Sequence, residues 1–315
     1  MPKILWIVVP CYNEHEVLPV SAPALMNKLD GFISAGRVSP DSRILFVNDG
    51  SRDGTWDIIT ALHEQNGHFC GISLAHNSGE QNAYLAGMFT AVKYADVIIT
   101  TDCDLQDDIN AMDEMLDRFD EGNEIVYGVR KKRVHEGVIH RNNAGLFYKL
   151  MKLCGTELVG EHSQYRLMSR RAVEMLSQYG EVNMFIPALV PLIGLKNTTV
   201  EHERMERAAG KSNYSFAKLV KLSVEAVTSF SSAPLALITL FTVFSVVLSA
   251  VCLVGLVIAS VDNGAFSMPW AVLASVWMIA AGLGASVRII GEYICKNYIE
   301  TKKRPRYIID KVNIK

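Results

Sequence analysis

The chain has 315 residues, enough for one large domain or two smaller ones with a sizeable core. Its formal net charge of −2 excludes the overall basic field that is typical of nucleic-acid binders. Half of the residues are hydrophobic and the mean hydropathy is positive, which is high for a soluble enzyme. The six cysteines are scattered without a CxxC pair, so we expect reduced thiols and neither a disulfide framework nor a zinc site.

The first 130 residues alternate short apolar runs with helical patterns. Runs rich in Ile and Val predict buried strands at Ile4–Val9, Arg43–Val47, Gly71–Ala75, Val97–Thr101 and Glu124–Tyr127. Helical apolar spacing covers Glu14–Ala35, Asp53–Gln65 and Gly79–Tyr94. This order predicts an α/β fold with a mostly parallel sheet and helices on both faces. The first run is too short for a signal peptide, so we expect residues 1 to about 215 to stay where they are made.

Polar motifs follow three of these strands: PCYNE at 10–14, NDGS at 48–51 and DCDLQDD at 102–108. Because ligands of such sheets bind beyond the carboxyl ends of the strands, we expect the three motifs to form one site. Glu14 is expected to accept hydrogen bonds from a base or ribose, or else to be an acidic charge at a helix N-terminus. Asp49 is a candidate nucleotide contact, and Gly50 allows a tight turn after it. Ser51 or Asp53 is expected to cap the next helix.

The third motif, DCDLQDD, has two interpretations, metal binding and helix capping. Residues i and i+2 of an extended chain share a face, so the carboxylates of Asp102 and Asp104 are expected on the same side. Hard oxygen ligands of this kind suit Mg²⁺ or Mn²⁺, which also bind diphosphate oxygens. Gln106 adds a neutral oxygen. Asp107 and Asp108 are expected to cap a helix over 109–119, and capping by the whole motif is the alternative that leaves no metal site.

The second half becomes basic and irregular, and then strongly apolar. Residues 233–261 and 265–287 are runs of 29 and 23 residues without a charge. Each exceeds the ~20 residues that cross a bilayer, so 233–293 predicts a hairpin of two transmembrane helices rather than buried core helices. Residues 215–232 are expected to form an amphipathic interfacial helix, and 294–315 a basic tail. Lysines and arginines flank the hairpin and are absent from its 262–264 loop, so both termini are expected in the cytoplasm.

Eight segments together resemble glycosyltransferase family 2, the inverting enzymes of GT-A type, with a Rossmann-like catalytic domain, that use nucleotide-diphosphate sugars. They are VPCYNE, VNDGSRDGT, NSGEQNAYLAGM, DCDLQDD, YGVRKKR, YRLMSRRA, ERMERAAGKSNY and IIGEYICKNYIETKKRPRYII. The resemblance covers essentially the whole chain and is closer to the polyprenyl-phosphate hexosyltransferases, which include bacterial undecaprenyl-phosphate glucosyltransferases and dolichol-phosphate mannose synthases. It implies a GT-A domain over 1–214 at the cytoplasmic face of the bacterial inner membrane, and a homotetramer.

The resemblance also implies roles for individual residues. Those that would hold the nucleoside are Pro10, Tyr12, Glu14 and Asp49. Those that would surround the Mg²⁺ or Mn²⁺ ion and the diphosphate are Asp102, Asp104 and Gln106. Those that would bind the acceptor phosphate or close over the phosphates are Arg130, Arg141, Arg204, Arg207 and Ser212. Guanidinium forks suit these roles because they bind phosphate oxygens in pairs.

The implied reaction moves one hexosyl group, glucose in first place, from a UDP-sugar to undecaprenyl phosphate. GlcNAc, galactose or mannose are the alternatives for the sugar. A processive polysaccharide synthase is a rival, but its Q-x-x-R-W signature is missing, since QYRLM has no Trp. A catalytically silent, membrane-anchored scaffold is the rival from another class.

Two departures from the relatives motivate that last rival. Gln164 stands where relatives usually carry an aspartate, and Pro187 follows a segment after which they often carry an arginine. Gln164 cannot accept a proton, but a phosphate monoester with a second pKa near 6 is already largely dianionic at neutral pH. The attacking phosphate oxygen therefore needs no general base. Glu161 or His162 is a candidate to orient the acceptor instead, although a structural role is the more frequent one for such a histidine.

Overall fold

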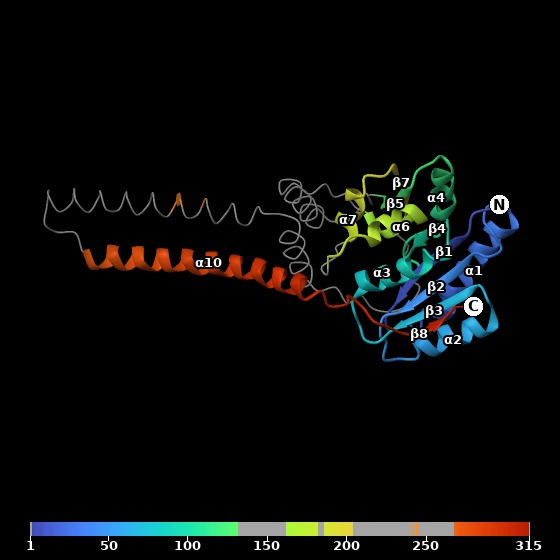
Figure 1. The fold of residues 1–315 in the computed structure, drawn as a ribbon, viewed down its shortest axis with the longest axis horizontal. Helices are drawn as coiled ribbons and strands as arrows, with labels where there is room; N and C mark the ends of the chain where they lie inside the picture. Colours follow the sequence, from blue (N-terminus) through green and yellow to red (C-terminus); the bar gives the residue numbers. More distant parts are fainter. Residues whose placement is uncertain are drawn as a thin grey trace. The chain divides into compact units, whose positions relative to one another are not determined.

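The computed structural model describes residues 2–131, 162–181, 186–203, 240, 243–244 and 268–314. Its centre is an eight-stranded sheet with the strand order β7-β5-β6-β4-β1-β2-β3-β8 (Figure 1). Among the paired strands, β6 and β8 run antiparallel to their neighbours and the other pairings are parallel. The predicted α/β fold with a mostly parallel sheet is confirmed.

The middle of the sheet is made by strands that were predicted from their apolar runs. They are β1 (Leu5–Cys11), β2 (Arg43–Asn48), β3 (Phe69–Leu74) and β4 (Val97–Thr100). Nearly every residue in them is buried, because helices cover both faces of the sheet. A parallel strand that is buried on both faces reads as a continuous apolar run, which explains why the sequence predicted these strands within two residues at each end.

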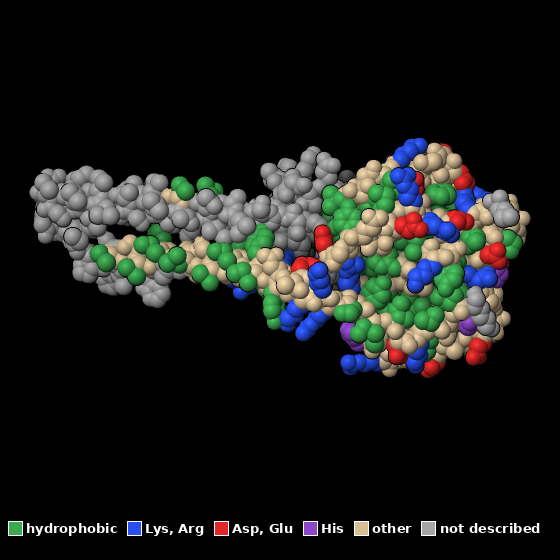
Figure 2. Space-filling model, in the orientation of Figure 1, with side chains coloured by type: hydrophobic (Ala, Val, Ile, Leu, Met, Phe, Trp, Pro, Cys, Tyr) green, Lys and Arg blue, Asp and Glu red, His purple; other side chains and the backbone are tan. Residues whose placement is uncertain are grey.

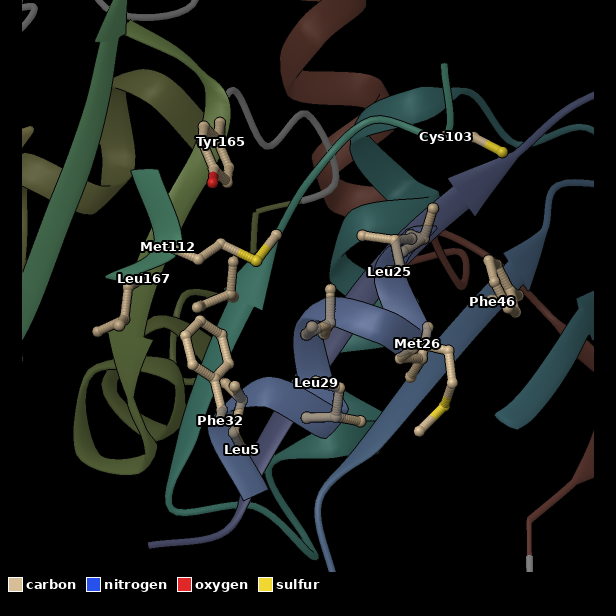
Figure 3. Packing of buried hydrophobic residues seen from close by; sticks show 14 of the residues in the cluster. Leu5, Leu25, Met26, Leu29, Phe32, Phe46, Cys103, Met112, Tyr165 and Leu167 are labelled. Carbon is tan, nitrogen blue, oxygen red and sulfur yellow. The ribbon is translucent and has the colours of Figure 1, made fainter. Parts of the chain in front are cut away.

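Helices on opposite faces of the sheet pack against alternate residues of the same strand. The helices of this part of the chain are α1 (Leu18–Ser34), α2 (Thr55–Gln65), α3 (Glu80–Ala91) and α4 (Ala111–Asp120). Leu25, Leu29 and Phe32 of α1 pack into one core cluster with residues of β1, β2 and α4 (Figure 3). On α3, a Cβ atom at Gly87 would lie 2.3 Å from Val8 Cγ1, so this helix packs directly on the other side of β1.

The predicted strand at Glu124–Tyr127 is β5 (Ile125–Arg130). The region after residue 130, which was expected to be irregular, contributes the strands β6 (His162–Ser169) and β7 (Asn197–His202) to the same sheet, and it also contains the helices α6 (Arg170–Ser177) and α7 (Ile186–Leu192). β6 inserts antiparallel between β4 and β5, and β7 runs parallel to β5. The N-terminal end of β6 therefore meets the carboxyl ends of β4 and β5 at one edge of the sheet.

The C-terminal segment, which was expected to be a basic tail, contains a strand. β8 (Ile309–Asn313) pairs antiparallel with β3, and Ala75 N donates to Ile308 O at 2.9 Å. Residues 304–315 consequently belong to the same compact unit as the sheet. This strand has only five residues, and its alternation is too short to be recognised without its partner.

The helix α10 (Met268–Lys302) belongs to a second unit of the chain. It contains most of the second predicted transmembrane span and continues for fifteen residues beyond it. Within the residues that the structure describes, no helix has both the length and the apolar character that are needed to cross a membrane. The first predicted span, apart from Leu240, Val243 and Phe244, lies outside those residues, as does the interfacial helix over 215–232. The two transmembrane helices are therefore not confirmed.

Candidate functional site

The loops after β1 and β2 are joined to each other by side-chain hydrogen bonds. Asn13, which has a left-handed φ of 55°, donates its backbone N–H to Ser51 Oγ at 2.9 Å. The backbone N–H of Glu14 donates to Thr55 Oγ1 at 2.9 Å. Asp53 Oδ1 accepts from the backbone N–H of Thr55, the first residue of α2, but the N-cap of this helix is Gly54 and no side chain caps it, so the prediction that Ser51 or Asp53 caps the helix is wrong. These contacts bring the first two predicted motifs together at the carboxyl edge of the sheet, with Pro10 in β1 and the half-exposed Tyr12 in the following loop.

Asp49 is buried and supports the loop that precedes α3. Its Oδ1 accepts from Ser78 N at 2.7 Å and its Oδ2 from Gly79 N at 3.0 Å. Burial raises the pKa of this carboxyl, and the two backbone N–H groups oppose that effect. Gly50 has a φ of 62°, and a Cβ there would lie 2.4 Å from Asn77 N, so the predicted tight turn requires glycine. The contact of Asp49 with a nucleoside stays a prediction.

The acidic motif forms a compact turn directly after β4. Leu105 in its middle has a left-handed φ of 53°, an uncommon conformation for a residue with a Cβ. Tyr84 Oη donates to Asp102 Oδ1 at 2.5 Å, and Asp104 Oδ1 accepts from Gln106 N at 3.1 Å. Burial raises the pKa of Asp102 to about 7, and the nearby Glu80 carboxylate acts in the same direction, while the Tyr84 hydrogen bond opposes it. The turn therefore holds more negative charge than its surroundings neutralise.

That excess of negative charge bears on whether the turn fits a metal ion. No group of three or more His, Cys, Asp and Glu side chains within the described ranges has an arrangement that would hold a metal. The predicted ligand set has instead two carboxylates, Asp102 and Asp104, and the amide of Gln106. A divalent ion that keeps several waters needs only one or two carboxylates from the protein. Burial and the neighbouring Glu80 raise the pKa of Asp102, and a bound cation would offset the negative charge that both of them disfavour, so these residues fit such an ion.

Asp107 does not cap the next helix, so this prediction is wrong. Its side chain is fully buried, and Oδ1 accepts from Arg130 Nε at 3.2 Å and from His202 Nε2 at 2.9 Å. Burial alone would raise the pKa of Asp107, but the hydrogen bond from His202 and the charge of Arg130 outweigh it and lower the pKa. Asp108 lies in the turn before α4 (Ala111–Asp120), where its Oδ1 accepts from Asn110 N. The N-cap of α4 is Asn110 and no side chain caps the helix, so the prediction that Asp108 caps it is wrong as well.

Gln164 lies in β6 at the same edge of the sheet, and its side chain meets a buried arginine. Arg166 Nη2 donates to Gln164 Oε1 at 2.8 Å, and Arg166 is only 1% exposed. Burial lowers the pKa of this guanidinium to about 10. Since arginine is only a donor, the amide oxygen of Gln164 must face it. The NH₂ group of Gln164 is then the part of the side chain that remains for a ligand.

Several predicted site residues lie outside the described residues: Arg141, Glu161, Arg204, Arg207 and Ser212. Two residues of the site were not predicted from the sequence: Tyr84 and Glu80, which act on Asp102 from α3. Their spacing of four residues puts both on one helix face, and this was the available signal. The four described cysteines are free thiols, as expected.

Comparisons with known proteins agree with the motifs. The profile of the family described as Glycosyl transferase family 2 matches residues 6–176. The uncharacterized glycosyltransferase YkoT of Bacillus subtilis (strain 168) is 40% identical over 98% of this chain and 91% of its own length. The prophage bactoprenol glucosyl transferase homolog of Escherichia coli (strain K12) is 33% identical over 97% of this chain and 98% of its own. The SfII prophage-derived bactoprenol glucosyl transferase of Shigella flexneri is 32% identical, with 97% of both chains covered.

Proposed function

The chain belongs to glycosyltransferase family 2, and on this premise we propose that it transfers a hexosyl group, glucose in first place, from a UDP-sugar to undecaprenyl phosphate. The observation that carries the proposal is the meeting of the acidic turn, Arg130 and Gln164 at the carboxyl edge of one sheet. An acidic turn suits a metal-bound diphosphate, and a guanidinium suits a phosphate. The names of the near full-length relatives, which are bactoprenol glucosyl transferases, support the lipid acceptor and the glucosyl group.

Asp102, Asp104 and Gln106 would hold the divalent ion. When bound, Mg²⁺ or Mn²⁺ acts as a Lewis acid that stabilises the charge of the departing diphosphate. Tyr84 fixes the orientation of Asp102 through its hydroxyl group, and the left-handed Leu105 turns the chain so that the acidic residues stay close together. These contacts organise the turn before any ligand arrives, which is the condition for electrostatic stabilisation of a transition state.

On the acceptor side, the residues bind and orient rather than remove a proton. The lipid phosphate is largely dianionic at neutral pH and attacks the anomeric carbon directly, in line with the departing UDP, so that the configuration inverts. The terminal guanidinium nitrogens of Arg130 and the NH₂ group of Gln164 donate to this phosphate. A neutral amide at position 164 serves this purpose better than a carboxylate, which would repel the acceptor.

We also propose that the protein is a multi-pass protein of the bacterial cytoplasmic membrane, with the catalytic domain and both termini in the cytoplasm. Support comes from α10, along which hydrophobic side chains are exposed (Figure 2). Most of the exposed hydrophobic residues of α10 recur every three or four positions, at Val272, Val276, Ile279, Leu283, Val287, Ile290, Ile294 and Tyr298, and Met278 and Ile299 are exposed beside them. A helical face of this kind is suited to lipid. A homotetramer remains part of this proposal.

The test incubates membranes containing the protein with undecaprenyl phosphate and labelled UDP-glucose, UDP-GlcNAc, UDP-galactose or GDP-mannose, each with Mg²⁺ or Mn²⁺. We expect lipid-linked glucose that disappears in EDTA and in Asp104→Ala. Absence of lipid-linked sugar from every donor would contradict the transferase reaction. Product that persists in EDTA would contradict the role of the metal ion. A preference for another sugar nucleotide would change only the identity of the transferred sugar.

A further inference from the structure

Asp107 occupies a position that neither the metal nor the helix start explains. It lies one residue beyond Gln106, yet its carboxylate is turned into the protein and is fully buried. Oδ1 accepts two hydrogen bonds, from Arg130 Nε and His202 Nε2. These two donors come from the adjoining ends of β5 and β7, where Arg130 and His202 are partners in the strand register.

The surroundings of Asp107 hold its partners in fixed places. The ring of Tyr165 packs edge-on against the His202 ring with 5.2 Å between their centroids. Tyr165 Oη also donates to the backbone oxygen of Asp108 at 3.2 Å, and Lys131 N donates to His202 O at 2.9 Å. The acidic turn is therefore fastened to the ends of three strands, β5, β6 and β7. A rigid frame of this kind keeps a charged group where a ligand needs it.

The contact with Arg130 uses only one part of the guanidinium. The donor to Asp107 is Nε, while the side chain of Arg130 as a whole remains 32% exposed. The two terminal nitrogens form the fork that binds phosphate oxygens in pairs. Holding Nε on a buried carboxylate fixes the plane of the guanidinium and so the direction in which this fork points.

We propose that Asp107 is a positioning residue, which presents the guanidinium fork of Arg130 to the phosphate of the acceptor. The proposal rests on the proposed function. Through the same carboxylate the protein sets the distance between the acidic turn, which serves the donor diphosphate, and the arginine, which serves the acceptor. Asp107 touches neither substrate and acts through Arg130, with His202 as the second group that holds it in place.

The test compares Asp107→Asn with Asp108→Asn in the full-length protein. The two substitutions are chemically identical and adjacent, but the carboxylate of Asp108 lies in the turn before α4, where it accepts from Asn110 N. We expect Asp107→Asn to raise KM for undecaprenyl phosphate by about tenfold to a hundredfold, because a misplaced binding group loses this much. KM for the UDP-sugar should stay within about twofold in both variants, since neither residue serves the donor. If the Asp107 variant matches the Asp108 variant, or raises both KM values equally, the positioning role is wrong.

Arg130→Lys provides a second variant in case Asp107→Asn does not fold. Lysine keeps the positive charge but has neither Nε–H nor a planar fork. We expect it to raise KM for the lipid phosphate as Asp107→Asn does, and an unchanged KM would contradict the proposal. Combining Asp107→Asn with Arg130→Gln should be no worse than Arg130→Gln alone, because one residue acts through the other, whereas additive losses would contradict it.

The two proposals fail in different ways. Wild-type protein that forms no lipid-linked sugar removes the proposed function and this role of Asp107 with it. Wild-type protein that is active, with an Asp107 variant that behaves like its Asp108 control, removes only the positioning role.

Discussion

Replacing Asp102 by asparagine is expected to stabilise the metal-free protein at alkaline pH. The folded carboxyl has a pKa of about 7 because it is buried beside Glu80, whereas an unfolded chain has ~3.9. The folded state therefore binds more protons between these pH values, and stability falls as the pH rises through that window. A difference of roughly 3 units corresponds to ~4 kcal/mol, and solvent screening of a partly exposed carboxylate lowers this to ~2 kcal/mol.

Asp102→Asn removes the charge while its amide oxygen still accepts from Tyr84. We expect the variant to be more stable than wild type by about 2–4 kcal/mol at pH 8 and about equal at pH 4. For a domain of this size that raises Tm by at least about 4 °C at pH 8. The assay is thermal unfolding of the full-length protein in detergent, between pH 4 and pH 8.

Two comparisons make this experiment specific. Asp108→Asn, in the turn before α4, should show no gain in stability at pH 8. Added Mn²⁺ should raise the Tm of wild type and not that of Asp102→Asn. A ligand that binds the folded state stabilises it more when it binds more tightly, and the variant lacks one of the carboxylates that would bind the ion. An Asp102 variant that gains no stability between pH 4 and pH 8 would refute the electrostatic account of the acidic turn.

Three further outcomes are expected. Gln164→Glu should increase the free energy of unfolding by about 1 kcal/mol, because Arg166 then donates a charge-assisted hydrogen bond. The same variant should lower kcat/KM for the lipid phosphate. A rise in activity in Gln164→Glu or in Gln164→Asp would show that a base is needed. Gly50→Ala should cost more than ~2 kcal/mol in chemical denaturation, because its Cβ would meet the backbone at Asn77; a neutral result contradicts the required turn. Asp107 has a lowered pKa, so the stability that its carboxylate contributes is present above pH ~4 and is lost below it. The difference in Tm between wild type and Asp107→Asn should therefore shrink in acid. A difference in Tm that is the same at every pH would contradict the ion pair.

Much of the fold was predictable because its signals are local. The first four strands and helices follow from apolar periodicity in short windows, and their observed ends differ from the predicted ones by a few residues. The convergence of the three polar motifs was also predictable, since the carboxyl ends of parallel strands share an edge. β6, β7 and β8 were missed, because their positions depend on partners that are distant in the sequence.

The sequence by itself determined the family and the first four strands and helices, and it singled out the acidic turn as the candidate centre of the site, because each is encoded in short motifs or short periodic windows. Only the tertiary structure decided which carboxylates of the acidic turn pair with side chains inside the protein. Asp107 looked like a second helix cap beside Asp108, but it pairs with Arg130 and His202, which lie 23 and 95 residues further along the chain. A buried carboxylate needs charged or hydrogen-bonding partners, and which residues supply them is settled by the packing of β5 and β7 against the turn.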